Sequence, residues 1–171
     1  MFVRMDYHKL LKQEEIHKAV KKLGRKLTDT YHGKSTIAIC VLNGAMWFFV
    51  DLTREIDLPI ECDSISVGSY VNNKQTNEFE IRNRPKLSVE GKHVLLIDDV
   101  YDTGKTLDTL KSMFEEQGAA SVKTVAFATK HPKVKPDYFC FEFDKSDYLV
   151  GYGLDDCEKF RNLDELGVIH D

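Results

Sequence analysis

The segment of residues 94–106 constrains the fold more than any other part of the chain. It begins with the apolar run Val-Leu-Leu-Ile, which is typical of a strand buried on both faces of a parallel sheet. Three carboxylates follow this run, and a Thr-Gly-Lys-Thr turn then begins a helical pattern. The acids are Asp98, Asp99 and Asp102, and the turn consists of Thr103, Gly104, Lys105 and Thr106.

These residue types in this order indicate a ligand. Open α/β sheets bind ligands outside the carboxyl ends of their strands, which is where the acids are expected. The amides of the turn, its two hydroxyls and the positive end of the helix dipole suit a phosphate. Carboxylates accept hydrogen bonds from sugar hydroxyls and also bind magnesium. The segment therefore predicts a site for a phosphorylated sugar.

Three other interpretations fit the segment less well. A P-loop requires glycine where this chain has Asp99, so the match to that motif is partial. An aspartyl-phosphate enzyme would have an Asp-x-Asp arrangement, which these acids do not supply. A purely structural role, with Asp102 or Thr103 capping the helix, accounts for one acid and one hydroxyl. It leaves unexplained three carboxylates whose mutual repulsion costs stability.

The rest of the chain alternates strands with helices, which predicts an α/β fold with a mostly parallel sheet. Predicted helices cover residues 13–30, 45–56 and 106–117. Predicted strands cover residues 36–42, 60–70, 93–97, 122–129, 138–143 and 148–150. The polar stretch 72–86 is predicted to be a loop, either a functional lid or a disordered segment.

Composition excludes several classes of protein. A length of 171 residues fits one domain, and a net charge of -4 argues against a general nucleic-acid coat. The basic face of the first helix could contact an anionic partner, although we favour a solvated surface. No apolar run approaches the roughly 20 residues that span a bilayer, and no signal peptide is recognised, which favours a cytoplasmic protein. The four scattered cysteines and six scattered histidines predict free thiols and no transition-metal site, whereas magnesium stays open.

The residues 98–106 resemble the phosphoribosyl pyrophosphate signature of the type I phosphoribosyltransferases. Asp102 is similar to the acid found in the enzymes that act on 6-oxopurines, whereas adenine, orotate and uracil-linked members typically have another residue there. Shorter matches follow in the family order over nearly the whole chain. They are residues 41–44, Ser69-Tyr70, Lys130, residues 148–155 and Phe160-Arg161. The chain thus resembles the hypoxanthine-guanine phosphoribosyltransferases.

The resemblance implies a type I phosphoribosyltransferase-like fold as a single domain of residues 1–171. A central, mostly parallel sheet would be flanked by helices, with a flexible lid at about residues 70–90. A small hood would form from the N-terminal segment and about residues 145–171. The implied assembly is a homodimer or homotetramer, without nucleic acid or membrane.

The implied activity is purine salvage with Mg²⁺ as cofactor. The partners would be phosphoribosyl pyrophosphate and a 6-oxopurine, and 5-phosphoribosyl would move to N9 of hypoxanthine or guanine. IMP or GMP and pyrophosphate would be the products. The alternatives are a phosphoribosyltransferase for xanthine, adenine or uracil, and an RNA-binding pyrimidine regulator on the same fold. The negative charge and Asp102 both count against the regulator.

The resemblance also assigns roles to the acidic segment. Asp98 and Asp99 would bind the ribose hydroxyls, directly or through magnesium. Asp102 would be the acid/base group near purine N7. The 5′-phosphate would be bound by Asp102, Thr103, Gly104, Lys105 and Thr106.

The resemblance also assigns roles to residues outside the segment 98–106. Lys130 would donate to purine O6, Tyr148 would stack on the ring, and Leu149 would offer its backbone to the base edge. Asp155, placed among the purine-binding residues, would hold a second magnesium ion with pyrophosphate. Pyrophosphate would be bound by Asn43, Gly44 and Arg161, and the lid would begin at Ser69 and Tyr70.

Four positions depart from the usual family residues. Asp98 replaces a common Glu, and Asn43 replaces a Lys or Arg, which puts a subunit-interface contact in doubt. Tyr148 replaces a Phe, and Asp156 replaces an aromatic residue, which adds negative charge near the pyrophosphate.

Overall fold

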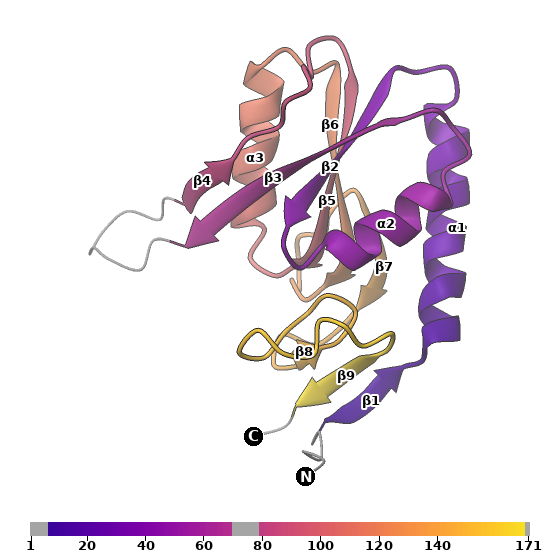
Figure 1. Ribbon diagram of the computed structural model, residues 1–171, viewed down its shortest axis with the longest axis vertical. Helices are drawn as coiled ribbons and strands as arrows, with labels where there is room; N and C mark the ends of the chain where they lie inside the picture. Colours follow the sequence, from indigo (N-terminus) through magenta and orange to yellow (C-terminus); the bar gives the residue numbers. More distant parts are fainter. Residues whose placement is uncertain (1–6, 70–78, 170–171) are drawn as a thin grey trace.

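The computed structural model describes residues 7–69 and 79–169, which form two sheets and three helices (Figure 1). In chain order the elements are β1 (His8–Leu11), α1 (Gln13–Tyr31), β2 (Thr36–Leu42), α2 (Met46–Arg54), β3 (Glu61–Ser69), β4 (Phe79–Asn83), β5 (His93–Tyr101), α3 (Lys105–Glu116), β6 (Ser121–Thr129), β7 (Tyr138–Glu142), β8 (Tyr148–Val150) and β9 (Leu166–Ile169).

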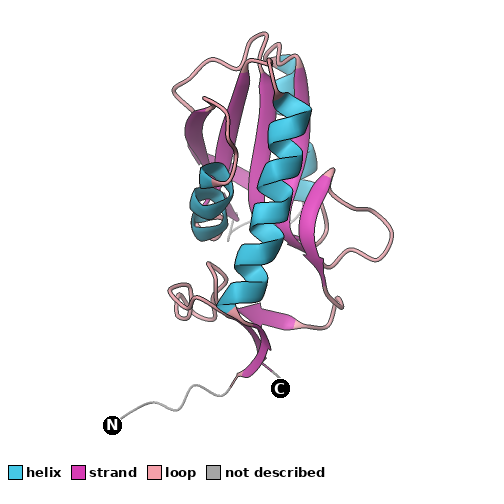
Figure 2. Cartoon of the chain, turned by 90° about the vertical axis from the view of Figure 1, so that its right-hand side faces the viewer, coloured by secondary structure: helices cyan, strands magenta, loops and turns pink. Residues whose placement is uncertain are grey.

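A six-stranded sheet forms the body of the molecule, in the order β4-β3-β2-β5-β6-β7. All its neighbouring strands are parallel except β4, which runs antiparallel to β3 at the edge. Helices α1 and α2 lie on one face of the sheet and α3 lies on the other (Figures 1 and 2). The predicted α/β fold with a mostly parallel sheet is confirmed.

The two core layers follow from the alternation of side chains along buried strands. On β2, Ala38 packs in the cluster of α1 and α2 with Phe48, whereas its neighbour Ile37 packs with Phe114 of α3. On β5, Leu95 and Ile97 face the first layer, and Val94 and Leu96 face the second. Both faces of the central strands are thus buried, which explains their continuous apolar sequences.

A second sheet of three antiparallel strands, in the order β1-β9-β8, lies at the end of the molecule near both termini (Figure 1). It consists of the two segments to which the resemblance assigns the hood. Glu165, just before β9, accepts a hydrogen bond from Tyr7 Oη at 2.5 Å and forms an ion pair with Lys9. Neither β1 nor β9 was predicted, because four-residue strands at opposite ends of the chain carry little periodic signal.

Most predicted elements agree with the structure within about two residues. Two boundaries were wrong. The strand predicted to end at residue 97 continues to Tyr101, because its backbone stays paired with β6 from Asp98–Ala126 to Tyr101–Thr129. Part of the stretch predicted as a loop forms β4, whose polar residues gain strand structure from backbone pairing with β3. Residues 70–78, which include Tyr70 and the first part of the predicted lid, lie outside the described residues.

The prediction for the cysteines agrees with the structure. The four cysteines are free thiols. Among the described residues no helix is both long and apolar enough to cross a membrane.

Candidate active site

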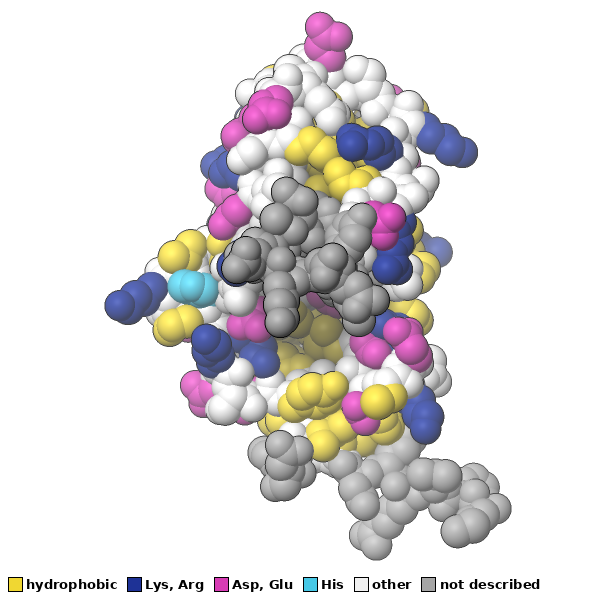
Figure 3. Space-filling view, turned by 90° about the vertical axis from the view of Figure 1, so that its left-hand side faces the viewer, with side chains coloured by type: hydrophobic (Ala, Val, Ile, Leu, Met, Phe, Trp, Pro, Cys, Tyr) yellow, Lys and Arg dark blue, Asp and Glu magenta, His cyan; other side chains and the backbone are white. Residues whose placement is uncertain are grey.

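The carboxyl ends of β2, β5 and β6 lie side by side, because these three strands are parallel neighbours. Register pairs Tyr101 with Thr129, and the amide of Lys130 donates to the carbonyl of Tyr101 at 3.0 Å. Asp102 and Lys130 therefore leave adjacent strands at the same level. Figure 3 shows the surface hollowed between the body and the three-stranded end, with acidic side chains flanking the hollow.

A small cavity of about 100 Å³ lies where β5 passes into α3. Gly104 has φ of +78° and directly precedes the helix, so a left-handed residue turns the chain there. A Cβ on Gly104 would lie 2.3 Å from Tyr101 Oη, so glycine is also required sterically. The cavity is lined by Asp98, Val100, Tyr101, Asp102, Thr103, Gly104, Thr106 and Leu107. Its size and its position at a helix N-terminus suit one phosphate group.

Asp98 and Asp99 place two partly buried carboxylates next to each other at the end of β5. Burial raises the pKa of Asp98 well above its usual range, and the charge of Asp99 raises it further. Burial also raises the pKa of Asp99, while hydrogen bonds and the nearby Arg161 guanidinium work in the opposite direction. Because two such groups repel, their environment favours a cation or a set of hydroxyl donors beside them.

Three segments of chain meet at Gly44. A Cβ on Gly44 would lie 1.7 Å from Asp99 Oδ2, and a Cβ on Gly153 would lie 2.1 Å from the carbonyl oxygen of Gly44. Hydrogen in place of a side chain at both positions lets the loop after β2 touch β5 on one side and the loop after β8 on the other. Asn43, the residue before Gly44, accepts a hydrogen bond from the amide of Met46 at the start of α2.

Arg161 joins these segments electrostatically. Its Nη1 donates to the carbonyl of Gly153 at 2.7 Å, and its Nη2 lies 2.7 Å from Asp155 Oδ1. Its Nε is buried and has no hydrogen-bond partner among the described residues. A buried donor without a partner is costly, so an anion oxygen at this position would stabilise the site.

The base side of the site is built from Lys130 and β8. Lys130 Nζ donates to the carbonyl of Asp147, which holds the lysine directly beside Tyr148. The side chain of Tyr148 is 52% exposed, and Tyr148 Oη donates to Asp156 Oδ1 at 3.4 Å. Leu149 is buried, so only its backbone is suited to contact a base.

The chemistry of the acids fits magnesium at Asp98 and Asp99, which needs few protein ligands. Within residues 7–69 and 79–169 no three His, Cys, Asp or Glu side chains form a metal cluster. The structure therefore does not bring Asp98, Asp99 and Asp155 together as one set of ligands. Asp155 instead pairs with Arg161, and its Oδ2 accepts the amide of Glu158 at 2.8 Å.

Some predicted positions are not joined to the site by the described contacts. Ser69 ends β3 and its side chain is not described, and Tyr70 lies outside the described residues.

The sequence analysis did not identify two residues that shape the site. They are Tyr101, which lies against Gly104, and Gly153, which contacts Gly44. The Gly-x-Gly at residues 151–153 was the available signal for the latter.

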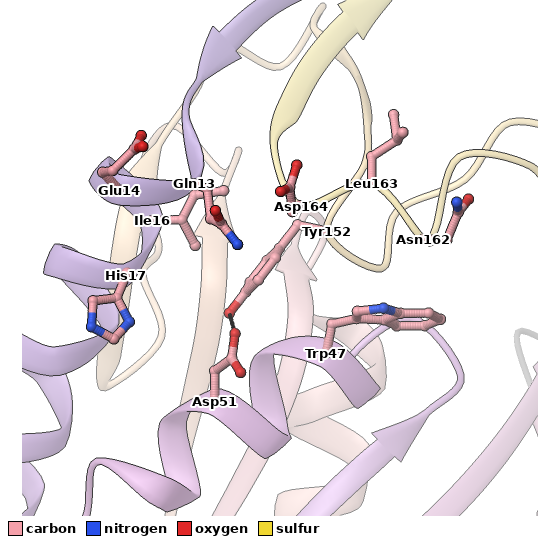
Figure 4. A pocket seen from close by; sticks show the side chains of 10 residues that line it. All are labelled: Gln13, Glu14, Ile16, His17, Trp47, Asp51, Tyr152, Asn162, Leu163 and Asp164. Atoms are coloured by element: carbon pink, nitrogen blue, oxygen red, sulfur yellow. Dashed lines mark hydrogen bonds between the residues drawn. The ribbon is translucent and has the colours of Figure 1, made fainter.

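A larger hollow, of about 470 Å³, lies between α1, α2 and residues 162–164 (Figure 4). Tyr152 Oη donates to Asp51 there at 2.7 Å, and Trp47 lies along one side. None of the predicted site residues lines it. We therefore place the chemistry at the strand ends.

Comparison with known proteins decides the family. Residues 6–156 match the phosphoribosyl transferase domain. The chain is 38% identical over 165 residues to the hypoxanthine-guanine phosphoribosyltransferase of Streptococcus pneumoniae, covering 94% of this chain and 91% of that protein. The chain belongs to the phosphoribosyltransferase family.

Two further comparisons concern this phosphoribosyltransferase. Its fold matches a solved hypoxanthine phosphoribosyltransferase of Staphylococcus aureus with a TM-score of 0.89 and 31% identity, over 95% of this chain and 91% of that one. The hypoxanthine-guanine-xanthine phosphoribosyltransferase of Tritrichomonas foetus is 34% identical over 164 residues, which cover 94% of this chain and 90% of that protein. The resemblance inferred from residues 98–106 is confirmed.

Proposed function

We propose that this enzyme transfers 5-phosphoribosyl from phosphoribosyl pyrophosphate to N9 of hypoxanthine and guanine, which is a purine salvage reaction. The supporting observation is that Asp102 and Lys130 leave neighbouring strands at one level, next to a phosphate-sized cavity. The names of the similar proteins agree with this activity. Neither the acidic charge nor these relatives favour the RNA-binding alternative.

The phosphoribosyl group is bound at the end of β5. Amides and hydroxyls of residues 103–106 bind the 5′-phosphate, and Asp98 and Asp99 bind the ribose hydroxyls. Asp102 receives or returns the proton at purine N7 as the base attacks the anomeric carbon. Its side chain is exposed and accepts no hydrogen bond from a described residue, so it is free for this role.

The purine is bound between Tyr148 and the strand ends. Lys130 Nζ exchanges the carbonyl of Asp147 for O6 of the base, which selects a 6-oxopurine because adenine has no acceptor there. Tyr148 stacks on the ring, and the backbone of Leu149 contacts the base edge.

Pyrophosphate is bound at the meeting point of Gly44 and Arg161. The amides of Asn43 and Gly44 and the guanidinium of Arg161 donate to its oxygens. Asp98 and Asp99 would hold magnesium, which would supply positive charge to balance the leaving pyrophosphate. We assign a second magnesium ion to Asp155, which requires its contact with Arg161 to loosen.

On the resemblance alone we also propose a single domain with a hood and a lid that includes Ser69 and Tyr70. We propose on the same ground a homodimer or homotetramer in the cytoplasm.

The experiment that tests the function is a nucleotide-formation assay with phosphoribosyl pyrophosphate and magnesium. Hypoxanthine and guanine are expected to be converted, whereas adenine and uracil are not. Conversion of adenine or uracil alone would keep the phosphate site and overturn the proposed base site. Binding of phosphoribosyl pyrophosphate without any transfer would favour a regulator.

Lys130→Ala is expected to lower kcat/KM for hypoxanthine and guanine by roughly 10- to 100-fold, because a hydrogen bond from a charged donor is worth about 1.5–3 kcal/mol. Steady-state kinetics measure this loss. The matched control is Lys133→Ala, which removes an exposed lysine three residues later. Equal kinetics for the two variants would remove Lys130 from the site.

Removal of magnesium with a chelator is expected to abolish transfer, because the charge on pyrophosphate must be neutralised for it to leave. Magnesium added in excess should restore the rate. Full activity in the chelator would contradict the assignment of magnesium to Asp98 and Asp99.

A further inference from the structure

Asp156 lies beside the face of the site that we assign to the purine. Its Oδ1 accepts the hydrogen bond of Tyr148 Oη at 3.4 Å. Burial and the negative charge of Asp156 both raise the pKa of the Tyr148 hydroxyl, so the phenol stays the donor. Two of the four residues that depart from the family pattern, Tyr148 and Asp156, are therefore in contact with each other.

The neighbouring acid, Asp155, is held differently. Both of its carboxylate oxygens are engaged, one by Arg161 and the other by the amide of Glu158. The guanidinium balances the charge of Asp155 here, and the magnesium ion proposed for Asp155 would balance it when that contact loosens. Asp156 forms no ion pair with a described residue. Its negative charge therefore interacts with the purine base that stacks on Tyr148.

The turn that presents Asp156 is well defined. The backbones of Asp156 and Lys159 exchange hydrogen bonds at 3.2 and 3.0 Å. The charged and titratable groups around the carboxylate are Tyr148, Asp155, the exposed thiol of Cys157 and the exposed Lys159. The thiol contacts Asp156 and its pKa is raised, so it adds no balancing positive charge.

We propose that Asp156 determines base specificity by disfavouring anionic purines, so that hypoxanthine and guanine are used and xanthine is rejected. This inference rests on the proposed function. Xanthine has a second oxo group and loses a proton near neutral pH, whereas hypoxanthine and guanine stay neutral there. A carboxylate over the edge of the stacking ring repels that anion, and its oxygens can accept from the amino group of guanine but not from an oxo group.

The test compares kcat/KM for xanthine with that for hypoxanthine, below and above the pH at which xanthine ionises. Asp156→Asn keeps the size of the side chain and an acceptor for Tyr148 but removes the charge. We expect this variant to raise the xanthine-to-hypoxanthine ratio about tenfold above that pH, and less below it. A residue with only a structural role would not shift this ratio with pH.

Two variants provide controls. Glu158→Gln removes a charge from the same loop, and its carboxylate lies 3.4 Å from Arg161 rather than beside Tyr148, so the ratio should not change. Tyr148→Phe removes the hydrogen bond but keeps the charge of Asp156, so the ratio should stay low.

The outcomes separate the two proposals. An unchanged ratio in Asp156→Asn, or wild-type enzyme that uses xanthine as well as hypoxanthine, would overturn the specificity proposal while the proposed function stands. If Tyr148→Phe raised the xanthine-to-hypoxanthine ratio as much as Asp156→Asn does, the effect would come from the position of the residue 148 ring. That result would overturn the charge argument. No transfer to any base by the wild type would overturn the proposed function itself.

Discussion

Asp102→Asn is expected to lower kcat by about 10²- to 10⁴-fold, which is the usual contribution of a positioned acid/base group. Binding of phosphoribosyl pyrophosphate should change only a few-fold, because the asparagine keeps the shape of the side chain and the amides of the turn are untouched. Single-turnover kinetics would measure the chemical step, and titration calorimetry would measure binding.

The thermal stability of Asp102→Asn should match that of the wild type, since the exposed carboxylate accepts no hydrogen bond from a described residue. Glu116→Gln, which alters an exposed acid at the other end of α3, is the control for a change of charge on this helix. Equal losses in binding and in rate would instead assign Asp102 a structural role.

Gly104→Ala is expected to raise KM for phosphoribosyl pyrophosphate roughly 100-fold, because the new methyl group displaces Tyr101 and tilts the amides that bind phosphate. A hydrogen bond to a charged group is worth about 1.5–3 kcal/mol, so loss of one or two accounts for this change. The left-handed backbone adds a stability cost of about 1–2 kcal/mol.

Gly91→Ala is the matched control for this variant. Gly91 has φ of +71°, close to the +78° of Gly104, but nothing lies within 4 Å of its Cβ position. Denaturant unfolding should show the backbone cost in both alanines and a further loss in Gly104→Ala from the displaced Tyr101, and only Gly104→Ala should lose substrate affinity. Normal affinity in Gly104→Ala would contradict a phosphate site at the start of α3.

Local sequence was sufficient for the body of the fold and for the phosphate site. The buried strands are continuous apolar runs, α1 buries Ile16, Val20 and Leu23 at helical spacing, and the turn at Gly104 is specified within a few neighbouring residues. Such features depend on backbone preference and side-chain periodicity over short distances, so they can be predicted from residue order.

Features that depend on distant backbone pairing could not be predicted in this way. Strand β4 and the short strands β1 and β9 exist because another strand supplies their hydrogen bonds, as when His8 pairs with Val168. The extension of β5 through Asp98 and Asp99 has the same cause, since β6 continues beside it.

Residue order therefore identified the acidic strand end, the phosphate turn and the family resemblance. Tertiary structure alone placed Arg161 against Gly153 and Asp155, brought Gly44 against Asp99, and set Asp156 beside Tyr148. The physical reason is that charges and hydrogen bonds act through space. Their strength depends on the separation and burial that the folded loops impose, not on distance along the chain.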